Sequence, residues 1–229
     1  MTLTVTVHAD AEEVTADAAG FLAAQIGEVI RVRGGCVIAL SGGSTPLPVY
    51  QRLRRLPVHW PKVAVIQTDE RLDRPYAVEI GRALGLDRSQ PQHTDVAVWS
   101  PIPAGAPGNA AVAYARQLAV LRPGDVPDIA VLGLGTDGHT AAVFDHLTGS
   151  GTGEPVVATV YREEPRVGLT AAYLRAIPTK VLLATGAGKR DALSRVVSPP
   201  GDRPRVPAAV VLAGDGYVFA DRAACPEGY

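Results

Sequence analysis

A histidine and two acidic residues lie on turns that directly follow apolar segments of the chain. Among the five histidines, only His139 has this position, at the end of the glycine-rich run 133–139. Because imidazole titrates near neutral pH, His139 can take a proton from water under physiological conditions. Asp137 and Asp69 are both candidates for orienting its ring, and the sequence does not decide between them. The alternative is a structural histidine bonded to a backbone carbonyl.

The segment 41–46, Ser-Gly-Gly-Ser-Thr-Pro, has the composition of an anion-binding turn. The backbone N–H groups of this turn stay accessible because Gly42 and Gly43 have no side chains. Two hydroxyls, of Ser44 and Thr45, precede a predicted helix N-terminus. Amides and hydroxyls at such an end bind anions. The alternative is a tight strand–helix turn that Ser44 or Thr45 caps.

A second glycine turn, residues 186–189, carries Lys189 into another predicted helix. It is not a nucleotide-binding P-loop, because Leu183 stands where the first glycine of that motif would fall and Arg190 stands where Ser or Thr is needed. Taken alone, Lys189 is equally well explained as a solvated lysine in a first helical turn.

The spacing of Gly133, Gly135 and Gly138 matches a dinucleotide-binding fingerprint, but its surroundings do not fit. Asp137 would repel a pyrophosphate, and no strand-ending acid follows at the required offset of about 20 residues. We therefore expect no nicotinamide cofactor. We also expect no metal, because no second histidine or cysteine lies at ligand spacing, and the chain has no Gly-x-Ser-x-Gly nucleophile turn.

The order of strand, glycine turn and helix repeats along the chain and predicts an α/β fold. Continuously apolar strands favour a doubly wound, mostly parallel sheet with helices on both faces, in a single domain over residues 1–229. The predicted strands are 2–8, 36–40, 63–67, 129–132, 155–161, 166–170, 181–185 and 218–220. The predicted helices are 11–31, 46–56, 76–84, 109–121 and 189–197, with surface connections at 87–107 and 199–207. In such sheets ligands bind beyond the carboxyl ends of the strands, where four of these turns would meet.

Composition narrows the classes of partner. Hydrophobic residues make up 47% of the 229 residues and the formal net charge is −1, so the chain offers no positive field for nucleic acid. An anionic ligand would need a few well-placed cations. No apolar segment reaches the length of a membrane span, and the N-terminus does not resemble a signal peptide. Cys36 reads as a buried residue and Cys225 as part of a loose C-terminal tail, which favours a reducing, cytoplasmic compartment.

Five motifs in order resemble the 6-phosphogluconolactonase family over roughly residues 10–222. They are Ser-Gly-Gly-Ser-Thr-Pro at 41–46, Asp-Glu-Arg at 69–71, Gly-Leu-Gly-Thr-Asp-Gly-His-Thr-Ala at 133–141, Arg-Val-Gly-Leu-Thr at 166–170 and Thr-Gly-Ala-Gly-Lys at 185–189. The resemblance implies hydrolysis of 6-phospho-D-glucono-1,5-lactone to 6-phosphogluconate, a step of the pentose phosphate pathway, without a cofactor.

The resemblance also suggests roles for the residues. His139 would be a general base oriented by Asp137 or Asp69. The residues that would bind the substrate and its phosphate are Gly42, Gly43, Ser44, Thr45, Arg71, Gly135, Arg166 and Lys189. The expected partner is a small phosphorylated sugar lactone, and the expected assembly is a monomer or a small homo-oligomer.

Two alternatives remain open at this stage. Glucosamine-6-phosphate deaminases share the superfamily, although Thr140-Ala141 after the histidine fits the lactonases better than the Ile-Ala that deaminases tend to carry. A sugar-phosphate-binding protein that has lost its chemistry is the second. The chain departs from the family where residues 72–79 lack a Ser-Asn pair and where Asp145 replaces a proline, so the sugar contacts and the exact substrate are open.

Overall fold

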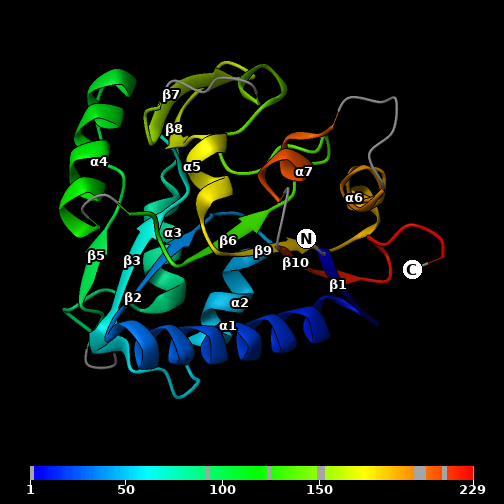
Figure 1. Cartoon of the computed structure of the whole chain (residues 1–229), viewed down its shortest axis with the longest axis horizontal. Helices are drawn as coiled ribbons and strands as arrows, with labels where there is room; N and C mark the ends of the chain where they lie inside the picture. Colours follow the sequence, from blue (N-terminus) through cyan, green and yellow to red (C-terminus); the bar gives the residue numbers. More distant parts are fainter. Residues whose placement is uncertain are drawn as a thin grey trace.

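A parallel sheet of seven strands forms the centre of the protein, seen in a computed structural model that describes residues 3–90, 93–122, 125–148, 153–198, 205–212 and 216–228. The strands lie in the order β1-β10-β9-β6-β2-β3-β5 (Figure 1). In chain order they are β1 (Leu3–His8), β2 (Cys36–Leu40), β3 (Val63–Gln67), β5 (Val98–Ser100), β6 (Ile129–Gly133), β9 (Thr179–Ala184) and β10 (Gly216–Asp221). All pairings in this sheet are parallel, which confirms the predicted fold class.

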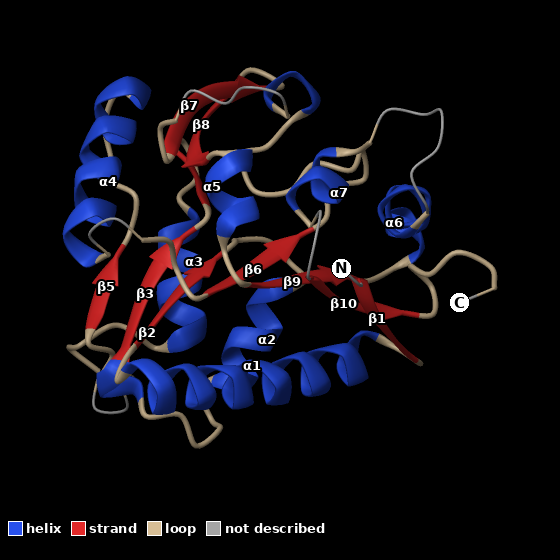
Figure 2. Ribbon diagram, in the orientation of Figure 1, coloured by secondary structure: helices blue, strands red, loops and turns tan. Residues whose placement is uncertain are grey.

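Helices cover both faces of this sheet (Figure 2). They are α1 (Ala11–Arg33), α2 (Pro46–Leu53), α3 (Tyr76–Leu84), α4 (Pro107–Leu121), α5 (Ala171–Ala176), α6 (Arg190–Val197) and α7 (Pro207–Val211), with 3-10 turns at Trp60–Lys62, Asp145–Leu147 and Ala187–Lys189. Alternate residues of each strand point to opposite faces. In β2, Ile38 therefore belongs to the apolar cluster that includes residues of α1, α2 and α3, whereas Ala39 belongs to the cluster that includes residues of α4 to α7.

The local sequence of the first helix explains where it begins and which of its faces is buried. Asp10 caps α1, because its carboxylate accepts the backbone N–H groups of Glu12 and Glu13. Such a cap contributes about 1 kcal/mol. Val14, Ala18, Leu22 and Ile26 follow at helical spacing and are buried against the sheet. The helix was predicted over 11–31 and runs two residues further, to Arg33.

A second, antiparallel sheet stands beyond the carboxyl edge of the first, and the sequence analysis did not predict it. It contains β4 (Asp69–Arg71), β8 (Glu164–Leu169) and β7 (Val156–Tyr161), in that order. The strands β7 and β8 were predicted within a residue or two, but Asp69–Arg71 was expected to be a turn. It becomes a strand because it pairs with β8, with Arg71 opposite Arg166.

Other differences concern short elements and the C-terminus. The strand β5 and the helices α5 and α7 were not predicted, and β5 lies within the expected surface connection 87–107. Cys225 is buried rather than part of a loose tail, because its backbone N–H bonds to the carbonyl of Asp221 and anchors it beside Ala224.

Thr2 and residues 199–204 of the predicted loop lie outside the described residues. In the described part of the chain no helix combines the length and apolarity that crossing a membrane requires.

Candidate active site

One cavity at the carboxyl edge of the large sheet gathers nearly all of the predicted site residues. It has a volume of about 260 Å³, just below the roughly 300–1,000 Å³ of small-ligand pockets. The predicted residues on its wall are Gly42, Gly43, Ser44, Thr45, Asp69, Arg71, Gly135, His139, Arg166 and Lys189. Asp137 is the exception, and it lines a neighbouring cavity that shares His139. Turns after β2, β3, β6 and β9 therefore meet at one place.

His139 and Asp137 form a hydrogen-bonded pair on the turn after β6. The Nδ1 atom of His139 lies 2.6 Å from Oδ1 of Asp137, and the His139 backbone N–H donates to the same oxygen at 3.2 Å. Burial opposes ionisation of Asp137, but hydrogen bonds from Tyr161 and His139 outweigh it and lower its pKa to about 2. An ionised carboxylate can only accept, so Nδ1 carries a proton, and in the neutral imidazole the lone pair is then on Nε2.

Asp69, the other carboxylate that the sequence left open, is engaged elsewhere. It is buried, its Oδ1 accepts the hydroxyl of Thr68 at 3.0 Å, and its Oδ2 lies 3.9 Å from Nη1 of Arg166. Burial raises the pKa of Asp69, while Thr68 and Arg166 counteract that effect. The carboxylate in hydrogen-bond contact with His139 is therefore Asp137.

Two arginines of the small sheet face each other across the β4–β8 pairing. Arg166 is buried, donates from Nη2 to Glu164 at 2.7 Å, and has an Nε atom without a hydrogen-bond partner among the described residues. The guanidinium of Arg71 lies 4.8 Å from the ring centre of Tyr76. Glu164 is within 4 Å of both arginines and Asp69 is within 4 Å of Arg166, so two carboxylates lie beside these two cations.

Lys189 adds a third cation from the turn after β9. Burial lowers its pKa, and the charge of Asp137 counteracts that effect. No hydrogen bond to its ammonium group occurs among the described residues. The turn is fixed by buried Asp221, at the end of β10, whose oxygens accept the Gly186 N–H at 3.0 and 2.9 Å. The hydroxyl of Thr185 also lies 3.1 Å from that of Thr45, which joins the two glycine turns.

The glycines of these turns provide space as well as N–H groups. A Cβ atom on Gly135 would lie 2.1 Å from Nδ1 of His139, and one on Gly42 would lie 2.2 Å from the ring of Tyr76. Gly135, predicted as a binding residue, is thus also needed for the histidine ring to pack closely. Thr45 stands at the N-cap of α2 but makes no side-chain hydrogen bond that caps the helix.

Sequence reasoning missed three residues around this site. Tyr76 opens α3 and lines the cavity between Gly42 and Arg71. Glu70 is buried and accepts the N–H groups of Arg71, Tyr76 and Ala77, which holds the start of α3 against β4. Tyr161, at the end of β7, donates its hydroxyl to Asp137. Glu70 stood inside the Asp-Glu-Arg motif, but nothing in the sequence pointed to either tyrosine.

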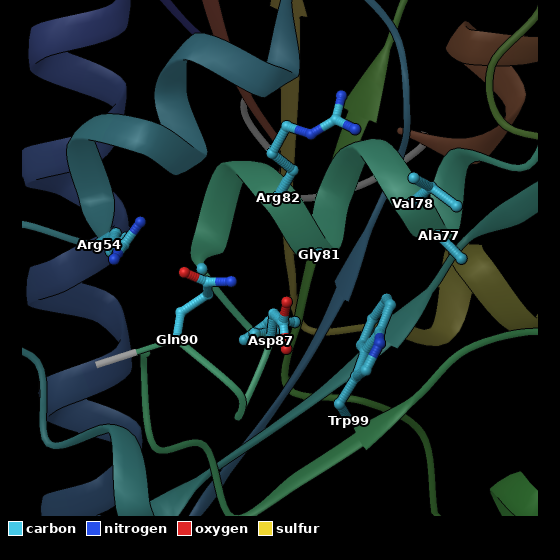
Figure 3. Close-up of a pocket in the computed structure, with 10 residues that line it drawn as sticks. Arg54, Ala77, Val78, Gly81, Arg82, Asp87, Gln90 and Trp99 are labelled. Atoms are coloured by element: carbon cyan, nitrogen blue, oxygen red, sulfur yellow. The ribbon is translucent and has the colours of Figure 1, made fainter. Parts of the chain in front are cut away.

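A larger cavity, of about 770 Å³, lies elsewhere, against α3 (Figure 3). Its wall includes Arg54, Arg82, Asp87 and Trp99, with Trp99 and Gln90 beneath the helix, and it contains none of the predicted site residues. Among the described residues no histidine, serine or cysteine lines it, and its one carboxylate there, Asp87, accepts hydrogen bonds from the backbone N–H and hydroxyl of Ser89. Within the described residues no group of three or more His, Cys, Asp or Glu side chains is arranged to hold a metal ion.

Comparisons with known proteins agree with the motifs. The family described as glucosamine-6-phosphate isomerases/6-phosphogluconolactonase matches residues 9–220. A 6-phosphogluconolactonase of Synechocystis sp. is 32% identical over 199 residues, which is 82% of each chain. One of Nostoc sp. is 31% identical over 213 residues, 88% of each chain. The solved structure of a 6-phosphogluconolactonase from Trypanosoma brucei superposes with a TM-score of 0.81 at 25% identity over 97% of each chain. The chain therefore belongs to the family of glucosamine-6-phosphate isomerases and 6-phosphogluconolactonases, and within it to the 6-phosphogluconolactonases that its motifs resemble.

Proposed function

We propose that this enzyme hydrolyses 6-phospho-D-glucono-1,5-lactone to 6-phosphogluconate, the lactonase step of the pentose phosphate pathway. The relatives of similar length carry that name. The observation that carries the proposal is an imidazole bonded to a carboxylate on the rim of a cavity whose wall holds three cations. A phosphorylated lactone needs both features, since one end is a dianion and the other an ester carbonyl. We place the reaction in the cytoplasm, where Cys36 and Cys225, both unpaired, would stay reduced.

The phosphate end of the substrate would lie among Arg71, Arg166 and Lys189. Charge-assisted hydrogen bonds from arginine and lysine suit phosphate oxygens. The buried Nε of Arg166 has no hydrogen-bond partner in the described part of the chain, so it offers a donor that an anion would satisfy. Ser44 and Thr45, with the N–H groups of Gly42 and Gly43, would complete the cradle. Asp69 would keep Arg166 in place by its charge, 3.9 Å away.

The chemistry would take place at His139. With its Nδ1 proton held by Asp137, Nε2 would take a proton from water as that water attacks the lactone carbonyl. The new C–O bond gives a tetrahedral intermediate, and backbone N–H groups of the glycine turns would stabilise its oxyanion. The imidazolium would then donate its proton to the ring oxygen as the ester C–O bond breaks. Binding of the phosphate would orient the carbonyl for this attack.

Replacing His139 by alanine tests this mechanism. General base catalysis contributes about 10²–10⁴-fold, so we expect His139→Ala to lower kcat by that factor and to leave binding of 6-phosphogluconate within about threefold. The matched control is His93→Ala, since His93 is exposed and lies away from the cavity. Acid release from freshly prepared lactone, corrected for spontaneous hydrolysis, measures the rate.

Two outcomes would contradict the proposal. Turnover of His139→Ala equal to that of the wild type would remove His139 from the mechanism. Release of ammonia from glucosamine 6-phosphate by the wild type, without acid release from the lactone, would instead identify a deaminase. Calorimetric titration with 6-phosphogluconate measures binding, and so distinguishes a variant that has lost catalysis from one that no longer binds.

A further inference from the structure

Both carboxylate oxygens of Asp137 are bound, and the second is bound by a tyrosine from the other sheet. Oδ1 accepts Nδ1 and the backbone N–H of His139, whereas Oδ2 accepts the hydroxyl of Tyr161. We infer that Tyr161 is a positioning residue that orients Asp137 and, through it, the imidazole of His139. This inference rests on the proposed function, because it assigns Tyr161 to the base of the lactone reaction.

Aromatic packing strengthens the assignment. The rings of Tyr161 and Phe144 are stacked, with centroids 4.1 Å apart and planes 4° from parallel. The ring of His139 lies 5.2 Å from Tyr161 and 5.1 Å from Phe144, tilted against both. Such tilted contacts are favourable geometries for ring pairs. The imidazole plane is therefore held by two rings and one carboxylate, and the hydroxyl of Tyr161 fixes the carboxylate.

The position of Tyr161 connects the two sheets. Asp137 and His139 lie on the turn after β6, while Tyr161 ends β7, just before a turn in which Arg162 and Glu163 have positive φ angles of 49° and 67°. Two residues with left-handed backbone make this turn tight, so the end of β7 has a defined place. The small sheet would thus set the direction of the base through β7, and it carries two of the cations on β4 and β8.

Charges around the pair favour a tyrosine that donates and an aspartate that stays ionised. The hydrogen bond to Asp137 raises the pKa of Tyr161, and the same bond is the largest effect lowering the pKa of Asp137 against burial. Among the described residues, the charged or titratable groups around the pair are Lys189, Arg162, Asp145 and His146, and Asp69 interacts with His139. At neutral pH Tyr161 is therefore a donor that leaves Asp137 free to accept the Nδ1 proton of His139.

The test removes only the hydroxyl. Tyr161→Phe keeps the ring that stacks on Phe144, and we expect kcat for the lactone to fall about tenfold while KM stays within twofold, because orientation of the base changes and phosphate binding does not. Tyr173→Phe is the matched control, since the hydroxyl of Tyr173 bonds to the backbone of Asp125, away from the cavity. A kcat for Tyr161→Phe equal to that of the control would overturn the inference.

A double-mutant cycle shows whether Tyr161 acts through Asp137. Asp137→Asn removes the carboxylate, so adding Tyr161→Phe to it should lower kcat by less than twofold further. A full tenfold loss in the double variant would show that Tyr161 acts by another route and would overturn the inference. A purely structural tyrosine would lower kcat alike in both backgrounds.

Nitrogen-15 NMR of the histidine rings gives a readout that does not depend on turnover, with His139→Gln used to assign the signals. In the wild type we expect one tautomer with the proton on Nδ1, and in Tyr161→Phe a mixture of both tautomers. If the wild type does not hydrolyse the lactone but the tautomer still changes, the proposed function fails and the positioning role stands. If the wild type hydrolyses it and Tyr161→Phe retains one tautomer and full kcat, the positioning role fails alone.

Discussion

At the scale of single residues, the proposal assigns base catalysis and anion binding to side chains of different chemistry. His139, bonded to Asp137 through Nδ1, has about a quarter of its side chain, 27%, exposed, so it can meet water and substrate. Arg166 is 4% exposed and donates a hydrogen bond to Glu164, which suits a group that would bind an anion. A mobile surface arginine would lose side-chain entropy on binding that Arg166 has already lost on folding.

Lys189 provides a pH test of the anion site. Burial lowers its pKa, so its charge should be lost at a pH below the ordinary range of lysine. Only the charged form binds phosphate strongly, so we expect affinity for 6-phosphogluconate to fall as pH rises through that lowered value. Lys189→Arg should stay charged and bind equally well from pH 7 to 10. Calorimetric titration over that range measures the effect.

Lys189→Ala should weaken binding of 6-phosphogluconate about tenfold at pH 7 and remove the alkaline dependence. The neighbouring cation offers a control: Arg190 bonds to the backbone of Ala223 and does not line the cavity, so Arg190→Ala should bind normally. Unchanged affinity in Lys189→Ala would exclude Lys189 from the anion site.

At the scale of elements, close approach between a backbone turn and a ring determines the geometry of the base. The turn after β6 doubles back so that the Gly135 N–H bonds to the carbonyl of His139 at 2.8 Å. This fold brings the imidazole over the Cα of Gly135, where any side chain would collide with Nδ1 and with Asp137. A side chain at position 135 would therefore displace the hydrogen-bonded pair.

Gly135→Ala should consequently misplace the base without unfolding the protein. A shift of about 1 Å in a catalytic group costs on the order of 100-fold in rate, and we expect kcat to fall by about that factor. Gly20→Ala is the control, because Gly20 lies in α1 with no atom within 4 Å of an added Cβ. That variant should keep kcat and gain about 0.5–1 kcal/mol of stability. A Gly135→Ala enzyme with wild-type kcat would show that the pair tolerates displacement.

At the scale of the whole molecule, the proposed active site lies between a parallel and an antiparallel sheet. The large parallel sheet supplies His139 and Lys189 from turns at its carboxyl edge, and the small antiparallel sheet supplies Arg71, Arg166 and Tyr161. The two sheets are joined where Thr68 links β3 to β4 and its carbonyl accepts the Leu169 N–H at 2.8 Å. Movement of the small sheet would therefore alter the cations and the base together.

The sequence predicts the large sheet well and the small one only in part, for physical reasons. Continuous apolar runs such as those of β2 and β6 identify buried parallel strands without any knowledge of their partners. The strand β4, Asp69–Arg71, is three charged residues, and only long-range pairing with β8 makes it a strand. The candidate cavity followed from topology, since parallel strands end at one edge. The choice between Asp137 and Asp69, and the role of Tyr161, depend on side-chain directions that spacing alone does not reveal.

The most direct measurement of the central claim is a crystal structure of the enzyme with 6-phosphogluconate, the proposed product. We expect its phosphate oxygens within about 3.2 Å of donors on Lys189 and on Arg71 or Arg166, and its C1 carboxylate within the same distance of Nε2 of His139. A phosphate bound outside this cavity, or a carboxylate turned away from His139, would contradict the account.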